Sequence, residues 1–125
     1  MEIAVQKFAA ICFFVVGLSH VLQARAWAEF FILLRAKGAA GNFVNGLLTL
    51  PAGALIVSFH NVWTGIPAAL TTLGWLFVAK SLVSFVYPPL ALRSLAAVSV
   101  ERSWTFAVAG AAMVAFSGLL AYSFL

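Results

Sequence analysis

Charge is scarce in this chain of 125 residues: only 8 % of its residues are charged, and aspartate does not occur at all. Soluble domains carry about 25 % charged residues. Hydrophobic residues instead make up 65 % of the chain. A chain this short cannot bury so much apolar surface within itself, because small domains bury the smallest fraction of their surface. The composition therefore excludes a soluble enzyme and a nucleic-acid-binding domain, and it predicts a protein whose solvent is the lipid bilayer.

Cysteine and acidic residues are also few. Cys12 is the single cysteine and lies in an apolar run, which excludes an internal disulfide and a cysteine-based metal cluster. The acidic residues Glu2, Glu29 and Glu101 all lie at or beyond the ends of the apolar segments. Proton-coupled transport usually relies on Asp or Glu inside the membrane. The sequence therefore does not favour a proton-coupled transporter.

Four apolar segments are long enough to cross a bilayer, which takes about 20 helical residues for a hydrocarbon core of about 30 Å. These spans are predicted at residues 3–22, 42–63, 66–87 and 104–125. A tight hairpin at 61–65 joins the middle two, and Pro67 is suited to the first turn of the helix that follows. Pro88 and Pro89 end the third span.

The connectors 23–41 and 88–103 hold most of the charge, and we predict that both form short amphipathic helices at the membrane interface. In the first connector, Trp27, Phe30 and Phe31 are expected at headgroup level, and Gly38 is expected to end the helix. The predicted fold class is all-α: a single integral membrane domain over residues 1–125, built as a four-helix bundle with two amphipathic interfacial connectors.

The basic residues predict the orientation of the spans. Five of them lie in the two connectors: Arg25, Arg35, Lys37, Arg93 and Arg102. The hairpin at 61–65 has none, and the N-terminal segment has Lys7 alone. Because cytoplasmic loops carry the excess of Lys and Arg, both connectors are predicted to be cytoplasmic. The hairpin and both termini are then outside, and the expected location is a bacterial inner membrane.

The N-terminal segment has a second interpretation. Ala26-Trp27-Ala28 has the pattern of a signal-peptidase site after an apolar stretch. Glu2 and the position of Arg25, between the apolar stretch and the cut, favour a retained first span instead. The sequence does not decide whether this segment is cleaved.

Lys80 is the most informative polar residue, because it lies well inside the third span, about 21 Å from the outer end of that span at 1.5 Å per residue. Ionisable residues are expensive in a bilayer and need an explanation. One interpretation is that Lys80 extends to the cytoplasmic headgroups along its own stem. The other is that it binds an anionic lipid headgroup or a small anion.

Other polar side chains are predicted at the same depth. Asn42 and Asn45 begin one face of the second span, Ser84 follows Lys80 by one helical turn, and His20 ends the first span. A candidate ligand-binding cluster therefore comprises Lys80, His20, Asn45, Asn42 and Ser84. The alternative interpretation is that these groups form hydrogen bonds between helices, worth about 0.6–2 kcal/mol each.

His60 and Asn61 are predicted to form a polar cap on the external hairpin. His20 and His60 are expected near opposite membrane faces, so they cannot both ligate one haem. Neither histidine has a second ligand at metal-binding spacing. No metal, no cofactor and no catalytic residues are predicted.

The layout resembles that of small uncharacterised bacterial inner-membrane proteins, including those of DoxX-like architecture. The resemblance rests on residues 17–22, 41–53 and 59–63. It implies only a four-helix membrane fold and its location, and no site residue follows from it.

The leading functional hypothesis is a non-enzymatic accessory or scaffold protein that binds membrane lipid or a membrane-protein partner. The alternative is a small oligomeric transporter or channel for an anion or a neutral solute. Neither hypothesis involves nucleic acid. A stripe of small residues in the last span would allow close helix packing within the bundle or between copies in a homo-oligomer or larger complex: Ala107, Ala111, Ala115 and Gly118.

Overall fold

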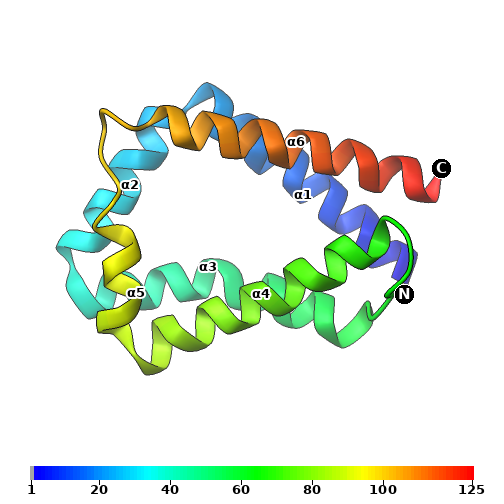
Figure 1. Cartoon of the computed structure of the whole chain (residues 1–125), viewed down its shortest axis with the longest axis horizontal. Coiled ribbons are helices and arrows are strands. Elements are labelled where there is room, and N and C mark those ends of the chain that lie inside the picture. The colour runs from blue at the N-terminus through cyan, green and yellow to red at the C-terminus, as the bar shows by residue number, and fades with distance from the viewer. Residues whose placement is uncertain (1) are drawn as a thin grey trace.

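The computed structural model describes residues 2–125, which form six helices (Figure 1). They are α1 (Glu2–Leu22), α2 (Ala24–Ala36), α3 (Gly38–Phe59), α4 (Pro67–Val86), α5 (Pro88–Leu95) and α6 (Trp104–Phe124). Within the described range, α1, α3, α4 and α6 are long and apolar enough to cross a membrane. The predicted all-α class is confirmed, and the chain has the helices of a multi-pass membrane protein.

The four spans pack as two pairs. Most contacts join α1 to α6 and α3 to α4, whereas α1 and α3 meet at few residues. Figure 1 shows the pairs lying apart through their middle, with α2 and α5 linking them at one end. Both termini and the α3–α4 loop lie at the opposite end. The two connectors therefore share one end of the molecule, as the predicted topology requires.

Two glycines permit the close contact between α1 and α6. A Cβ placed on Gly110 would lie 2.5 Å from the Gly17 carbonyl oxygen, and one placed on Gly17 would lie 2.8 Å from the Gly110 carbonyl oxygen. The small-residue stripe predicted from the sequence faces elsewhere, since Ala111, Ala115 and Gly118 are exposed. That stripe is therefore free for a neighbouring helix in the membrane.

Small and hydroxyl side chains bring α3 and α4 together. A Cβ on Gly53 would lie 3.0 Å from the Gly74 carbonyl oxygen. Further along the pair, the hydroxyls of Thr49 and Ser81 are 2.8 Å apart and hydrogen-bonded. These contacts hold the second helix pair without any charged group, as is usual for helices in lipid.

An apolar core joins the two pairs near the termini. It contains residues of all four spans: Val5, Ala9, Ala10, Ile56, Leu70 and Leu120. Phe13 and Phe116 pack against it, with their ring centroids 5.3 Å apart. The pairs are thus fastened at both ends of the molecule, by this core at one end and by α2 and α5 at the other.

The connectors differ in part from the prediction. Gly38 follows the end of α2 with a positive φ of 62°, so its predicted role as a helix terminator is confirmed. The second connector is helical only to Leu95 and not to residue 103. Arg35 Nη1 of α2 donates to the carbonyl oxygens of Leu95 (3.0 Å), Ala96 (3.2 Å) and Val98 (2.9 Å). The Arg35 guanidinium thus binds the free carbonyl oxygens at the C-terminal end of α5, where the helix dipole favours a positive charge.

The second span, α3, is displaced toward the N-terminus relative to the predicted 42–63. It begins at Gly38 and ends at Phe59. His60 has φ −141° and ψ 88°, an extended conformation that ends the helix. The α3–α4 loop is therefore longer than the predicted hairpin, although Pro67 occupies the first turn of α4 as expected.

Candidate functional site

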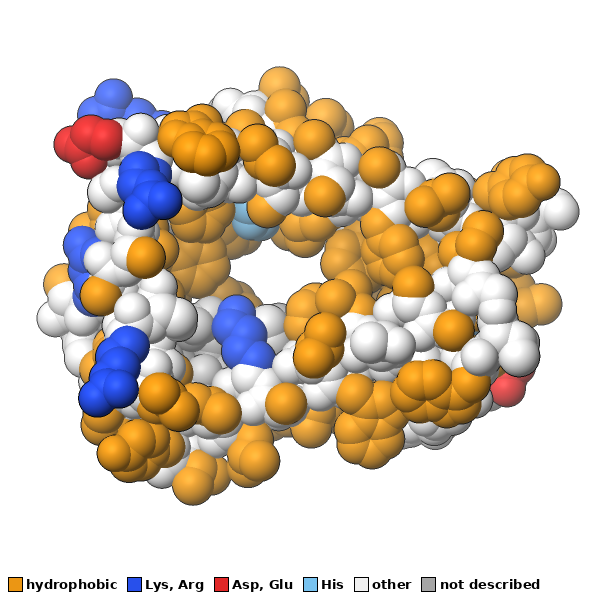
Figure 2. All heavy atoms as spheres, viewed as in Figure 1, with side chains coloured by type: hydrophobic (Ala, Val, Ile, Leu, Met, Phe, Trp, Pro, Cys, Tyr) orange, Lys and Arg blue, Asp and Glu red, His pale blue; other side chains and the backbone are white. Residues whose placement is uncertain are grey.

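An opening passes through the molecule between the α1/α6 pair and the α3/α4 pair. Figure 2 shows it in the space-filling view, so side chains do not fill it. In Figure 1 the four spans run across the same view. The opening therefore runs crosswise to the spans and not along them. In a bilayer, which lies perpendicular to the spans, such an opening faces the hydrocarbon core and not the water at either surface.

Phe13 and Phe77 meet between the two helix pairs. Their ring centroids are 6.5 Å apart, which brings α1 and α4 together at this level. Phe77 is followed one turn later by Lys80, on the same side of α4. Lys80 therefore lies on the side of α4 that faces α1, one turn nearer to the connectors than this aromatic contact.

Lys80 is exposed in the structure. It lies one turn beyond Phe77, whose ring meets Phe13 between the two helix pairs. Lys80 is the only Lys or Arg from Gly38 to Val86. Six residues separate it from the end of α4, or about 9 Å at 1.5 Å per residue. Among residues 2–125 the one ion pair is Arg25–Glu29, 3.2 Å, so Lys80 has no acidic partner there.

The structure brings together Asn42, Asn45 and Ser84 of the predicted cluster. All three are buried, with exposed fractions of 0 %, 3 % and 0 %, and Asn42 Nδ2 of α3 lies 3.5 Å from the Ser84 carbonyl oxygen of α4. Asn42 Nδ2 donates to the Pro88 carbonyl oxygen at 3.1 Å. Within the described chain, no partner bonds to Asn42 Oδ1, Asn45 Oδ1 or Ser84 Oγ. Buried groups of this kind ordinarily bond to ordered water.

His20 belongs to the other side of the opening. Its ring stacks on Trp27, with centroids 4.1 Å apart, and its Nδ1 donates to the Val16 carbonyl oxygen at 2.8 Å. Its Cβ would lie only 2.6 Å from a Cβ placed on Gly110, so His20 packs closely against α6. The contacts of His20 are thus with α1, α2 and α6, and none of them is with Asn42, Asn45 or Ser84 of the α3/α4 interface.

Aromatic rings extend this side of the site. Phe31 stacks on Phe106 with centroids 5.6 Å apart, and Trp27 Nε1 donates to Ser19 Oγ at 2.9 Å. The headgroup-level position of Trp27 and Phe31 stays a prediction, and in the structure both rings pack on residues of α1 and α6. The three-to-four-residue spacing of Trp27, Phe30 and Phe31 was the available signal. This spacing indicates that the three rings lie on one face of the helix, but it does not indicate which neighbouring helices that face contacts.

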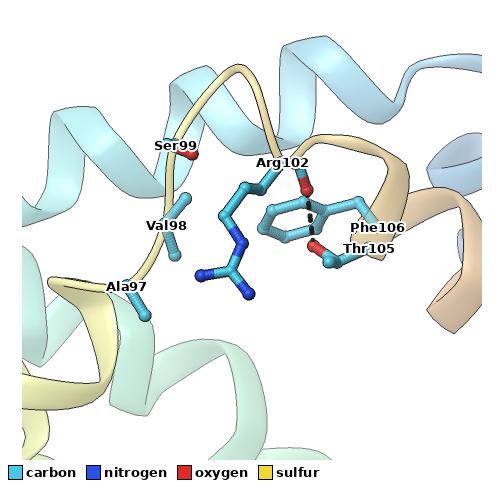
Figure 3. A pocket seen from close by; sticks show the side chains of 6 residues that line it. All are labelled: Ala97, Val98, Ser99, Arg102, Thr105 and Phe106. Carbon is cyan, nitrogen blue, oxygen red and sulfur yellow. Dashed lines mark hydrogen bonds between the residues drawn. The ribbon is translucent and has the colours of Figure 1, made fainter.

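A shallow pocket of about 180 Å³ adjoins the start of α6 (Figure 3). It is lined by Ala97, Val98, Ser99, Arg102, Thr105 and Phe106. Figure 3 shows the Arg102 guanidinium pointing into it, while the Arg102 carbonyl accepts a hydrogen bond of 2.8 Å from Thr105 Oγ1. Phe106 connects this pocket to the aromatic side of the opening. No sequence pattern indicated this pocket, because the α5–α6 loop that forms it was expected to be helical.

His60 is fully buried, with an exposed fraction of 0 %, and so differs from the external cap predicted for it. Its Nε2 lies 3.0 Å from Gln6 Nε2 and its Nδ1 lies 2.9 Å from Thr71 Oγ1. These contacts join α1, the end of α3 and α4. Asn61 alone remains exposed, and its Nδ2 donates to the Val57 carbonyl oxygen at 2.6 Å.

The direction of these hydrogen bonds follows from Thr71. Its hydroxyl lies 2.7 Å from the Val62 carbonyl oxygen, which can only accept, so the hydroxyl donates there. Thr71 must then accept from His60 Nδ1–H. His60 Nε2 is left as an acceptor for the Gln6 amide N–H. In the neutral imidazole both ring nitrogens have a hydrogen-bond partner. In the protonated ring, Nε2 would carry an N–H that points at the N–H of the Gln6 amide, so two donors would face each other.

Burial lowers the pKa of His60 below its usual 6.5, against smaller opposing effects of its backbone hydrogen bond and of the Glu2 carboxylate, both of which raise that pKa. The neutral imidazole is therefore the favoured form at neutral pH. These hydrogen bonds connect α1, the end of α3 and α4, and their role is structural. Within residues 2–125, no group of three His, Cys, Asp or Glu is placed to hold a metal ion.

Comparisons with known protein families, with curated proteins and with solved structures give no match to this chain, so the resemblance to DoxX-like proteins stays a prediction.

Proposed function

We propose that this protein is an accessory integral membrane protein without enzymatic activity, which binds membrane lipid in the opening between its two helix pairs. The observation that carries the proposal is the direction of the opening, which runs crosswise to the spans and so meets the hydrocarbon core (Figure 2). Acyl chains are the molecules that fill such a space in a bilayer. A lipid bound there would help hold the two pairs together.

The surface around the opening supports the same function. Arg102 points into the pocket beside α6, at the end of the molecule that carries the connectors. Basic side chains at the membrane surface attract anionic headgroups, by about 1 kcal/mol each. The exposed face of α6 formed by Ala111, Ala115 and Gly118 provides a surface on which a partner helix or a second copy could pack closely.

We place the protein in a bacterial inner membrane with both connectors in the cytoplasm, from the distribution of Lys and Arg. A cysteine replacing Thr64, in the α3–α4 loop, is expected to react with a membrane-impermeant thiol reagent added from outside. A cysteine replacing Arg93, on α5, is expected to react only after the membrane is opened. Both variants carry Cys12→Ser, so that labelling reports one site. External labelling at residue 93 would reverse the orientation.

Lipid binding is tested on the intact protein extracted from its membrane in mild detergent. Native mass spectrometry is expected to show a retained lipid that survives detergent removal. Added lipid is expected to raise the melting temperature of delipidated protein, because a ligand that binds only the folded state stabilises it. A lipid-free monomer without a co-purifying partner, whose melting temperature does not respond to lipid, would contradict the proposed function.

A small oligomeric transporter or channel for an anion or a neutral solute is the second candidate, favoured by the unpaired charge of Lys80 at the opening. The crosswise direction of the opening means that one chain offers no path along its spans. Such a function would need a path between copies of the chain. Flux of a panel of ions and neutral solutes into protein-containing liposomes separates this candidate from the accessory role.

A further inference from the structure

Lys80 requires a counter-ion from outside the chain. It is the only basic residue of the α3/α4 pair, and its side chain is exposed within a spanning helix. The one ion pair among residues 2–125 joins Arg25 to Glu29. A charge inside a spanning helix is costly unless it is paired or reaches water. The anion that pairs with Lys80 must therefore come from the lipid or from solution.

The membrane surface nearer to Lys80 is the one at which the connectors lie. Lys80 lies about 9 Å from the end of α4 at helical rise, and α2 and α5 cross that end of the molecule (Figure 1). Arg35 fastens α2 to the residues at and just beyond the end of α5. The side approach, through the crosswise opening, stays available. That approach begins in the lipid and not in the water.

The surroundings of the opening select the kind of anion. The rings of Phe13 and Phe77 meet one turn from Lys80, and those of Trp27, Phe31 and Phe106 lie on the α1/α6 side. A small hydrated ion gains nothing from these apolar groups. An anion attached to acyl chains gains both the charge of Lys80 and the burial of its chains.

We infer that Lys80 and the crosswise opening form a binding site for one anionic phospholipid, whose phosphate contacts the Lys80 ammonium and whose acyl chains lie beside Phe13 and Phe77. This inference rests on the proposed function and adds the charge class of the lipid and the route by which it enters. Charge selects the headgroup, and the apolar opening holds the chains.

The experiment offers the full-length protein an equimolar mixture of phosphatidylglycerol and phosphatidylcholine with identical acyl chains, and counts retained lipids by native mass spectrometry. Wild-type protein is expected to retain one lipid and to prefer phosphatidylglycerol by at least about fivefold, the effect of one lysine near an anionic lipid. Lys80→Gln is expected to remove the preference, and Lys80→Arg to keep it.

Lys7→Gln is the matched control, because Lys7 is the other lysine within a span and lies 6.0 Å from the centre of the Phe124 ring, at the end of the molecule away from the connectors. It is expected to keep the preference. If Lys80→Gln keeps it as well, the inference is overturned. Lipid retained by wild-type protein without a headgroup preference overturns the inference and leaves the proposed function standing. No retained lipid of either kind overturns both.

A second measurement applies to wild-type protein and does not depend on how a variant folds. Phosphatidylglycerol carrying a photoreactive diazirine on one acyl chain is crosslinked to the protein, and the modified peptides are mapped. Crosslinks are expected around Phe13 and Phe77. Crosslinks confined to exposed residues distant from this contact, such as Tyr122 near the end of α6, which is 77 % exposed, would contradict the site.

Discussion

Replacing Gly110 by alanine is expected to lower the free energy of unfolding by about 1–3 kcal/mol, the usual cost of overpacking a tight contact. The added Cβ would lie 2.5 Å from the Gly17 carbonyl oxygen and 2.6 Å from the Cβ of His20. The first of these neighbours is backbone, so α1 and α6 must separate to make room. Thermal unfolding in detergent, followed by circular dichroism, measures the loss.

Gly118→Ala is the control in the same helix. A Cβ at Gly118 would meet nothing within 4 Å, and alanine stabilises a helix by up to about 1 kcal/mol relative to glycine. This variant is expected to be as stable as the wild type or more so. Equal losses at residues 110 and 118 would show that α1 and α6 do not pack as described.

Replacing Thr71 by valine is expected to cost about 1–3 kcal/mol for each buried group that it leaves unpaired. The change keeps the shape of the side chain but removes the acceptor of His60 Nδ1–H and the donor to the Val62 carbonyl oxygen. The fastening of α1 to the second helix pair through Gln6 is then weakened, because the imidazole loses its fixed orientation.

Thr72→Val tests whether the effect is specific. Thr72 is exposed, and its hydroxyl donates only to the Ala68 carbonyl oxygen of its own helix, at 2.9 Å. The melting temperature of this variant is expected to match that of the wild type. A loss at residue 72 comparable to the loss at residue 71 would mean that the His60 contacts contribute nothing to stability.

The same contacts predict how stability depends on pH. The pKa of His60 is lowered in the folded protein, so the unfolded chain binds its proton first as the pH falls. Stability from the neutral imidazole is fully present above about pH 6.5, the pKa in the unfolded chain, and declines below it by at most about 1.4 kcal/mol per pH unit. His60→Gln is expected to remove this decline between pH 6.5 and 5. An unchanged decline in that variant would assign the pH dependence to other groups.

The local devices of the fold were readable from the sequence because each depends on few neighbouring residues. Gly38 ends α2 since only glycine readily takes a positive φ. Pro67 begins α4 because proline fits the first turn of a helix, and α4 ends before Pro88 because proline cannot continue a helix. The end of α3 was not readable in this way. It is set by His60, which leaves the helix to reach Gln6 and Thr71 at distant positions in the chain.

The sequence predicted how far along each span the candidate site residues lie, but not which of them come into contact. Asn42, Asn45 and Ser84 were expected at one level, and all three are buried, with Asn42 reaching the Ser84 carbonyl oxygen. His20 has the same depth but packs on Trp27. Helical periodicity places a residue along the membrane normal and on a face of its own helix. It does not say which other helix that face meets.

By itself, the sequence determined that the chain has four apolar spans and which side chains lie at each depth, since both follow from composition and the constant rise of a helix. Only the tertiary structure decided that α1 pairs with α6 and α3 with α4, that Arg35 closes the end of α5, and that an opening separates the pairs beside Lys80. The physical reason is that the spans are predominantly apolar, and lipid tails are as apolar as their side chains. Hydrophobicity then cannot choose between neighbours in lipid, and close contacts at positions such as Gly17 and Gly110 make the choice.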